Sequence, residues 1–300
     1  MLRSFKLGKL FGIPLYIHST FILLPIWILL TNRGAGLATS LFLLLYLIAV
    51  FTCVVLHELG HALMARFFGI GTESITLFPI GGVARLERMS EKPSEEIAIA
   101  LAGPAVNLVI AALLAPVALI AILSGAMQGD ALFSPEAGVV TVIGRFTTFL
   151  WFANVMLLAF NLIPCFPMDG GRVLRALLSL GMGHLRATEM AARIGLLMAF
   201  LIASMSVILP VVLDWAANPM LVVLALFVLF AGQQELWMVR RLDAQRRMGR
   251  LAQPIPQPEL VSVSDEPRPR SDVPFSGVAW DSRYRVWVKW HNGHPVAYWG

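Results

Sequence analysis

The feature that most constrains the fold of this 300-residue chain is a series of long apolar stretches. A helix needs about 20 mostly apolar residues to cross a bilayer. Only 14% of the residues are charged, against about 25% in an ordinary soluble domain. The sequence therefore predicts an all-α polytopic membrane protein and excludes a soluble globule. We expect six transmembrane helices within residues 1–240, at about 13–31, 37–65, 95–125, 141–163, 188–213 and 219–239.

Lysine and arginine concentrate in alternate connections between these stretches. The loops on one side hold only Arg33 and Arg145. Short cytoplasmic loops are the ones enriched in basic residues, so we expect both termini in the cytoplasm. The net charge of +5 fits this bias. The sequence shows no basic face with base-stacking residues, so it does not indicate nucleic-acid binding. The basic residues of the expected cytoplasmic side are Arg3, Lys6, Lys9, Arg66, Arg85, Arg88, Lys92, Arg172, Arg175, Arg186, Arg240, Arg241, Arg246 and Arg247.

The C-terminal part of the chain has a different character. Residues 241–274 are polar and rich in proline, which predicts an extended cytoplasmic linker. Residues 275–300 alternate aromatic or β-branched with polar residues, and Asn292-Gly293 is a hairpin-turn signal. We expect a small Trp-rich β-meander of two or three strands. Its tryptophans form either a small core or a recognition surface, whose partner would be a regulator or a second copy of the chain.

The second apolar stretch carries His57-Glu58-Leu59-Gly60-His61. Histidines at i and i+4 lie on one helical face, so both imidazoles can bind one Zn²⁺. Glu58 lies close by without being a ligand, and in this pattern it serves as the general base. Ionisable residues are costly at membrane depth and mark functional sites there. The alternative is a hydrogen-bonded polar cluster that stabilises the bundle.

A catalytic zinc ion needs a third protein ligand and one open position. The best candidate is Asp169, because the apolar stretch before it breaks at two prolines and two glycines follow it. Irregular backbone at membrane depth is tolerated where it lines a cavity. Two alternatives remain open: Asp169 is the N-cap of a helix that begins near Arg172, or Cys165 is a soft ligand in its place.

Two further polar features lie in or beside the apolar stretches. Residues 74–87 predict a membrane-dipping β-hairpin or loop, which either accepts a substrate as an added strand or packs over the zinc-binding helix. Asn107 and Asn154 lie within apolar stretches and are expected to hydrogen-bond between helices. For Asn107, a place in the lining of the active cavity is the alternative.

The two motifs together resemble the site-2 protease family of intramembrane zinc metalloproteases. The resemblance rests on HELGH and on NLIPCFPMDGG, and it extends over about residues 3–240. It is greatest to the compact prokaryotic branch, with six spans and without PDZ or CBS domains. The resemblance implies that His57, His61 and Asp169 bind one zinc ion per chain. It also implies that Glu58 is catalytic and that Asn161 positions the substrate or the transition state.

The resemblance further implies a protease of the prokaryotic cytoplasmic membrane that acts within the lipid bilayer. Its expected substrates are single-span membrane proteins that another protease has already cleaved. A non-catalytic zinc-binding scaffold, or pseudoprotease, is the alternative, and the intact Glu58 argues against it. A zinc transporter would spread its ligands along a pathway, and a rhomboid-type serine protease would need a G-x-S-G pattern that the sequence lacks.

Overall fold

The computed structural model describes most of the first 213 residues and the C-terminal segment. The chain divides into two compact units, Met1–Met248 and Gly249–Gly300, and each is described by itself. The described residues are 4–88, 90, 92–127, 138–213, 226, 228–230, 232–234, 236–241, 244–245, 274–281 and 285–299.

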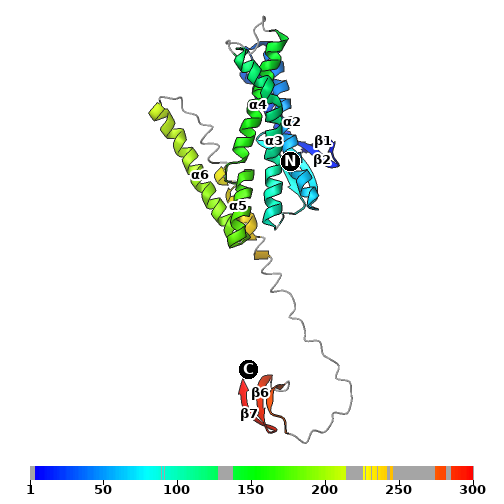
Figure 1. Cartoon of the computed structure of the whole chain (residues 1–300), viewed down its shortest axis with the longest axis vertical. Coiled ribbons are helices and arrows are strands. Elements are labelled where there is room, and N and C mark those ends of the chain that lie inside the picture. Colours follow the sequence, from blue (N-terminus) through cyan, green and yellow to red (C-terminus); the bar gives the residue numbers. More distant parts are fainter. Residues whose placement is uncertain are drawn as a thin grey trace. The chain divides into compact units, whose positions relative to one another are not determined.

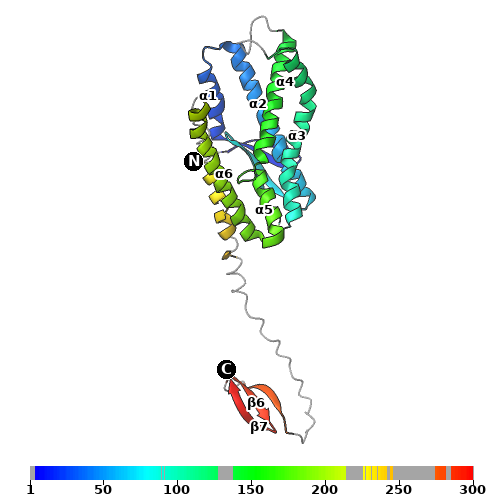
Figure 2. The same ribbon diagram turned by 60° about the vertical axis from the view of Figure 1, so that its left-hand side comes forward.

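The first unit is mostly helical and is an integral, multi-pass membrane structure. Among the described residues, four helices are long and apolar enough to cross a bilayer. Helices α2, α3 and α4 lie side by side, while α5 packs against α3 and α6 (Figures 1 and 2). The four long helices are α2 (Gly36–Phe67), α3 (Pro93–Leu123), α4 (Val139–Asn161) and α6 (His184–Leu213); the shorter α5 is Asp169–Met182.

The prediction of six spans is not confirmed. A helical span over 13–31 is wrong in its first part, because Ile13–His18 is strand β2 and Ser19–Ile22 is the 3₁₀ helix η1. Helix α1 (Leu23–Thr31) has 9 residues, and at 1.5 Å per residue it reaches only about half of a 30 Å hydrocarbon core. The predicted span at 219–239 lies largely outside the described residues.

A four-stranded sheet packs beside the helices. Strands β1 (Ser4–Leu10), β2, β3 (Thr72–Phe78) and β4 (Gly81–Leu86) lie in the order β1-β2-β3-β4. The hairpin predicted at 74–87 is confirmed as the antiparallel pair β3–β4. The β1–β2 hairpin was not predicted, and β2 continues the sheet by pairing in parallel with β3.

The sheet covers the part of α2 that carries the histidine motif. Ile13 of β2 and Ile75 of β3 are buried against Leu59 and Ala62 of α2. Nearer the N-terminus of α2, Leu77 of β3 packs on Val54 and Val55. Because side chains alternate along a strand, Ile75 and Leu77 lie on one face of the sheet, and this is the face that packs against α2.

Helix α3 approaches α2 from another side, and Gly60 makes that approach possible. A Cβ atom at Gly60 would lie 2.7 Å from the carbonyl oxygen of Ala102. No side chain larger than hydrogen therefore fits there without moving a backbone. The polar side chains of α3 can then reach the histidines of α2.

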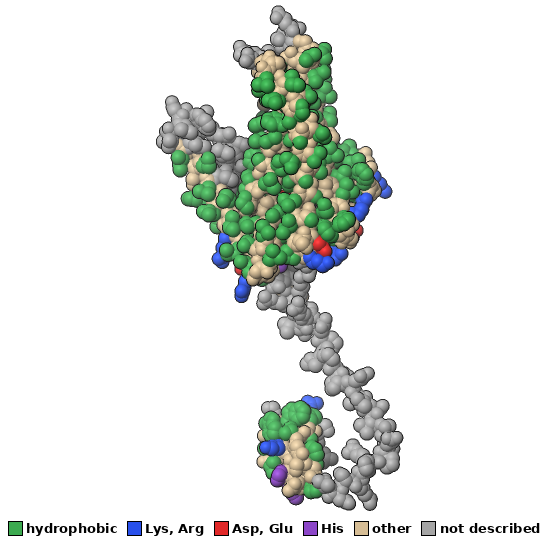
Figure 3. Space-filling model, in the orientation of Figure 1, with side chains coloured by type: hydrophobic (Ala, Val, Ile, Leu, Met, Phe, Trp, Pro, Cys, Tyr) green, Lys and Arg blue, Asp and Glu red, His purple; other side chains and the backbone are tan. Residues whose placement is uncertain are grey.

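Charged side chains are unevenly distributed on the first unit. On the face shown in Figure 3, hydrophobic side chains cover most of the helical body, and Lys and Arg gather at its lower end. The C-terminal end of α3 and the N-terminal end of α4 lie at the opposite end of the unit (Figure 1). This separation matches the bias of the sequence, in which the loops of one side hold few basic residues.

The second unit contains a three-stranded antiparallel sheet, in agreement with the expected β-meander. Its strands are β5 (Gly277–Asp281), β6 (Val286–His291) and β7 (His294–Trp299), in that order. Asn292 and Gly293 connect β6 to β7 with φ of 49° and 78°, as an Asn-Gly hairpin turn requires. Most of the predicted linker, 241–274, lies outside the described residues.

Candidate metal centre

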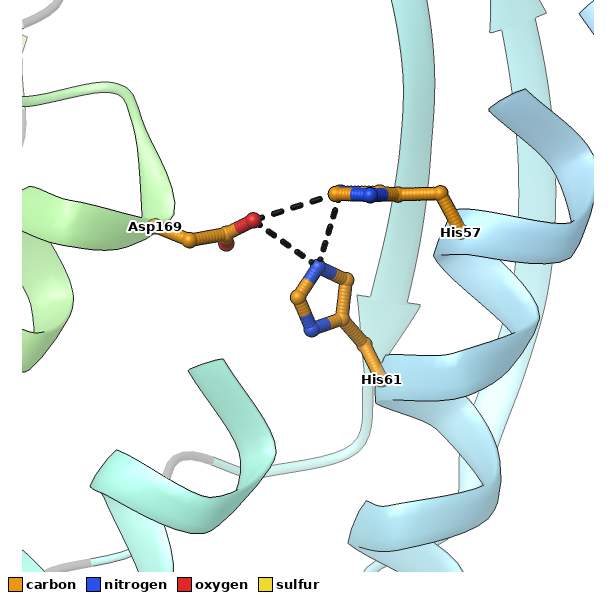
Figure 4. Close-up of side chains that lie close together, drawn as sticks. All are labelled: His57, His61 and Asp169. Carbon is orange, nitrogen blue, oxygen red and sulfur yellow. Dashed lines mark hydrogen bonds and ion pairs between the residues drawn. The ribbon is translucent and has the colours of Figure 1, made fainter. Parts of the chain in front are cut away.

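The structure brings His57, His61 and Asp169 together inside the first unit (Figure 4). His57 Nε2 lies 3.1 Å from His61 Nε2, and Asp169 Oδ2 lies 3.2 Å and 3.1 Å from these two nitrogens. All three side chains are buried. The two histidines are one turn apart on α2, and Asp169 comes from α5, 108 residues further along the chain.

Asp169 reaches the histidines because the backbone turns tightly between α4 and α5. It is the first residue of α5; Met168 is the N-cap, and no side-chain hydrogen bond caps this helix. A Cβ atom at Gly170 would lie 2.4 Å from the carbonyl oxygens of Leu162 and Ile163. At Gly171 it would lie 2.5 Å from the carbonyl carbon of Cys165. Glycine is therefore required at both positions for α5 to start against this turn.

Helix α3 orients both histidines. His57 Nδ1 lies 3.1 Å from Asn107 Oδ1, and His61 Nδ1 lies 2.7 Å from the carbonyl oxygen of Ile99. Both oxygens can only accept, so each histidine donates its Nδ1–H. This leaves each Nε2 free to bind a metal, and second partners of this kind are usual for metal-ligating histidines.

The donor set fits a zinc ion, the cofactor expected from the sequence. Two imidazole nitrogens and one carboxylate oxygen are common zinc ligands, and tetrahedral coordination at 2.0–2.1 Å places neighbouring ligand atoms about 3.4 Å apart. The observed separations are 3.1–3.2 Å. Gly103 leaves the space beside them, since a Cβ atom there would lie 2.2 Å from His61 Nε2. Three protein ligands leave the fourth position open for water or substrate.

Cys165, the rival ligand, lies outside this group. It is fully buried and packs against Ala199 of α6 and Val228. Its Sγ lies 3.9 Å from Met168 Sδ. The group of potential metal ligands among the described residues contains the carboxylate of Asp169 and no sulfur.

The side chain of Glu58, on α2, extends toward the sheet. Its Oε2 accepts a hydrogen bond of 2.9 Å from the backbone N–H of Ala84 on β4. Gly82 allows this contact, because a Cβ atom there would lie 2.7 Å from Glu58 Cγ. The carboxylate next to the metal ligands is thus held on strand β4.

For three other polar side chains, the contacts in the structure differ from those expected from the sequence. Asn161, predicted to act on the substrate, donates from Nδ2 to the carbonyl of Leu157 in its own helix, at 2.9 Å. Asn107 contacts a candidate ligand directly, which was only an alternative in the sequence analysis. Arg172 Nη1 lies 3.9 Å from Asp169 Oδ1, a contact that reasoning from the sequence missed. Its position three residues after Asp169, one helical turn away, was the available signal.

We expect the substitution Asn107→Leu to weaken zinc binding roughly 10- to 100-fold, because it removes the acceptor that orients His57. Asn107→Asp keeps an acceptor and should stay within a few-fold of the native affinity. Competition with a chelator of known affinity measures both. Asn154→Leu is the matched control, since Asn154 is also fully buried but bonds to Cys53 and Leu150. Equal zinc affinity of Asn107→Leu and the control would contradict this role.

Comparisons with known proteins agree with this geometry. The sequence profile of Peptidase family M50 matches residues 45–202, which include both histidines, Glu58 and Asp169. The structure is similar to that of the site-2 protease from Methanocaldococcus jannaschii, with 35% sequence identity and a TM-score of 0.53. That similarity covers 78% of this chain and 95% of the other.

Two curated relatives extend the comparison. Zinc metalloprotease MJ0392 of Methanocaldococcus jannaschii is 37% identical over 234 residues, which are 77% of this chain and 60% of that protein. Stage IV sporulation protein FB of Bacillus subtilis is 33% identical over 135 residues, 44% of this chain and 40% of that protein. The chain thus spans less than two thirds of the length of these relatives. Because the family profile covers more than half of the chain, including the metal centre, the chain belongs to peptidase family M50.

Proposed function

We propose that this chain is an intramembrane zinc metalloprotease of the site-2 type, which hydrolyses peptide bonds within or near transmembrane segments. The observation that carries the proposal is the buried His57–His61–Asp169 set, whose two histidines lie on α2, a helix long and apolar enough to cross a bilayer. Beside it lies Glu58, a carboxylate that is outside the ligand set. We take the substrates to be single-span membrane proteins that another protease has shortened.

The residues of the centre have distinct roles in this reaction. When bound, zinc lowers the pKa of a coordinated water and polarises the scissile carbonyl. Glu58 accepts a proton from the attacking water and delivers it to the leaving amine. We assign to Asn161, from the family resemblance, the role of donating a hydrogen bond to the oxygen that gains negative charge. To do so, its Nδ2 must leave the carbonyl of Leu157 that it contacts in this structure.

The exposed edge of the sheet supports strand addition by the substrate. Strand β4 is the last strand in the order β1-β2-β3-β4. Ala84 pairs with Ile75 of β3, yet its N–H donates to Glu58, so this N–H points away from β3. A substrate segment that pairs with this edge as an extended strand lies next to Glu58. Strand pairing also supplies the backbone hydrogen bonds that the segment loses when its helix unwinds.

The orientation follows from the basic residues. We propose that both termini are cytoplasmic, in a prokaryotic cytoplasmic membrane, because Lys and Arg gather in the part of the body away from the C-terminal end of α3 and the N-terminal end of α4. The bilayer is then the permanent environment of the helices, and water reaches the centre from the cytoplasmic side.

The substitution Glu58→Gln distinguishes between two hypotheses, a zinc protease and a non-catalytic zinc-binding scaffold. Because Glu58 is not a ligand, the variant should keep its zinc. It should lose cleavage of a transmembrane peptide by roughly 10²- to 10⁴-fold, the usual contribution of a general acid–base group. Metal analysis and a cleavage assay on the same detergent-solubilised sample test both points. Near-native cleavage by the variant would remove Glu58 from the mechanism, and zinc without cleavage by the native chain would favour the scaffold.

A second prediction concerns the substrate: if its helix must unwind locally before cleavage, a less stable helix should be cleaved faster. Two Leu→Gly changes next to the scissile bond cost the substrate helix about 1.5 kcal/mol. They should therefore raise kcat/KM on the order of 10-fold, since 1.4 kcal/mol corresponds to a factor of ten. The control is the same glycine pair placed two turns away in the same peptide. Identical rates for the two peptides would show that the substrate helix need not unwind at the cleavage site.

A further inference from the structure

A buried ion pair joins helix α3, whose Ile99 carbonyl contacts His61, to helix α5, which carries Asp169. Arg175 Nε donates to Glu96 Oε1 at 2.8 Å, and Arg175 Nη2 donates to the same oxygen. Arg175 is 0% exposed and Glu96 is 5% exposed. From the sequence, Arg175 was expected among the basic residues of the cytoplasmic side. The structure instead places it within α5, in the interior of the first unit.

Each partner of this pair is close in sequence to a group that shapes the metal centre. Glu96 precedes Ile99 by three residues on α3, and the Ile99 carbonyl accepts the hydrogen bond from His61. Arg175 follows Asp169 by six residues on α5. Its guanidinium also lies over the ring of Phe166, 5.2 Å from the centroid, in the turn that leads to Asp169. The ion pair therefore joins the helix that orients His61 to the helix and turn that carry Asp169.

The metal centre depends on this junction because its ligands come from two separate parts of the fold. The histidines lie on α2 and are held by α3, whereas Asp169 moves with α5. Metal–ligand distances tolerate deviations of only about 0.2 Å. A small shift of α5 along α3 would therefore carry the carboxylate out of reach of a metal held by the histidines.

We propose that Glu96 and Arg175 are a positioning pair that fixes Asp169 relative to His57 and His61 and thereby sets the affinity for zinc. Replacing a buried ion pair by apolar side chains often preserves or increases stability, whereas removal of one partner leaves a buried charge and destabilises. Stability alone therefore does not require these two residues. The directed hydrogen bonds of the guanidinium, which apolar side chains lack, supply the geometry. The proposal rests on the metal centre of the proposed function, but not on catalysis.

The test measures two quantities on the full-length protein in detergent: the zinc dissociation constant, by chelator competition, and the thermal unfolding midpoint of the zinc-free protein. Arg175→Met should lower the midpoint and weaken zinc binding. The double variant Glu96→Leu/Arg175→Met should recover the native midpoint while zinc binding stays roughly 10- to 100-fold weaker, as for other residues that orient metal ligands. Recovery of the native zinc affinity in the double variant would overturn the proposal and leave a purely structural pair.

Conservative and control variants keep the test decisive. Glu96→Asp retains the charge but shortens the side chain by one methylene, so it should weaken zinc binding at least several-fold with little change in the midpoint. If the Met variants do not fold, native zinc affinity in Glu96→Asp overturns the proposal by itself. The matched control is Lys92→Met/Glu95→Leu, which removes a nearby ion pair whose Lys92 side chain is 76% exposed. Cleavage by the native protein is assayed separately, so failure of this proposal leaves the proposed function standing.

Discussion

Two imidazoles and a carboxylate buried among apolar helices are stable only if each of their polar atoms has a partner. Helix α3 supplies partners for the Nδ1 atoms of His57 and His61, through Asn107 and Ile99. The two Nε2 atoms and Asp169 Oδ2 then converge on one point. A metal ion there satisfies all three atoms at once. The close approach of α2 to α3 brings the partners of the two histidines within hydrogen-bonding distance. The turn before α5 brings Asp169 to them, and the sheet holds Glu58.

Glycine allows several of these approaches. Gly103 leaves the space beside the metal-binding nitrogens, and Gly82 lets the sheet edge reach Glu58. Gly170 and Gly171 let α5 begin against the turn that precedes it. In each place a single Cβ atom would collide with a histidine of the candidate metal centre, with Glu58 or with the backbone. The geometry of the site therefore depends on these glycines as well as on the polar side chains.

The chemistry of the centre was largely predictable from the sequence, because it depends on local patterns. The i, i+4 histidines fix a helical face, and Asp169 is marked by the prolines and glycines around it. Asn107 could not be assigned to His57 from the sequence alone, because that contact depends on how α2 and α3 are aligned. Asn161 was matched to a family motif, and the structure shows it bonded to its own helix.

The errors in the fold have physical reasons as well. Residues 13–18 are apolar enough to resemble the start of a membrane span, and only pairing with β1 and β3 makes them a strand. The turn before them, Phe11-Gly12, has φ of 49° and 84° without the Asn-Gly signal that reveals the turn at 292–293. Arg175 was interpreted as a loop residue because a buried arginine is rare, and its partner Glu96 lies 79 residues away in the sequence.

The central claim is that His57, His61 and Asp169 hold the zinc ion. X-ray absorption spectroscopy at the zinc edge, on the full-length protein loaded with one zinc ion, tests it most directly. We expect a shell of nitrogen and oxygen ligands at about 2.0–2.2 Å, with the multiple-scattering signal of two imidazoles. A sulfur ligand at about 2.3 Å would contradict it, since that distance belongs to cysteine and would place Cys53 or Cys165 in the coordination sphere.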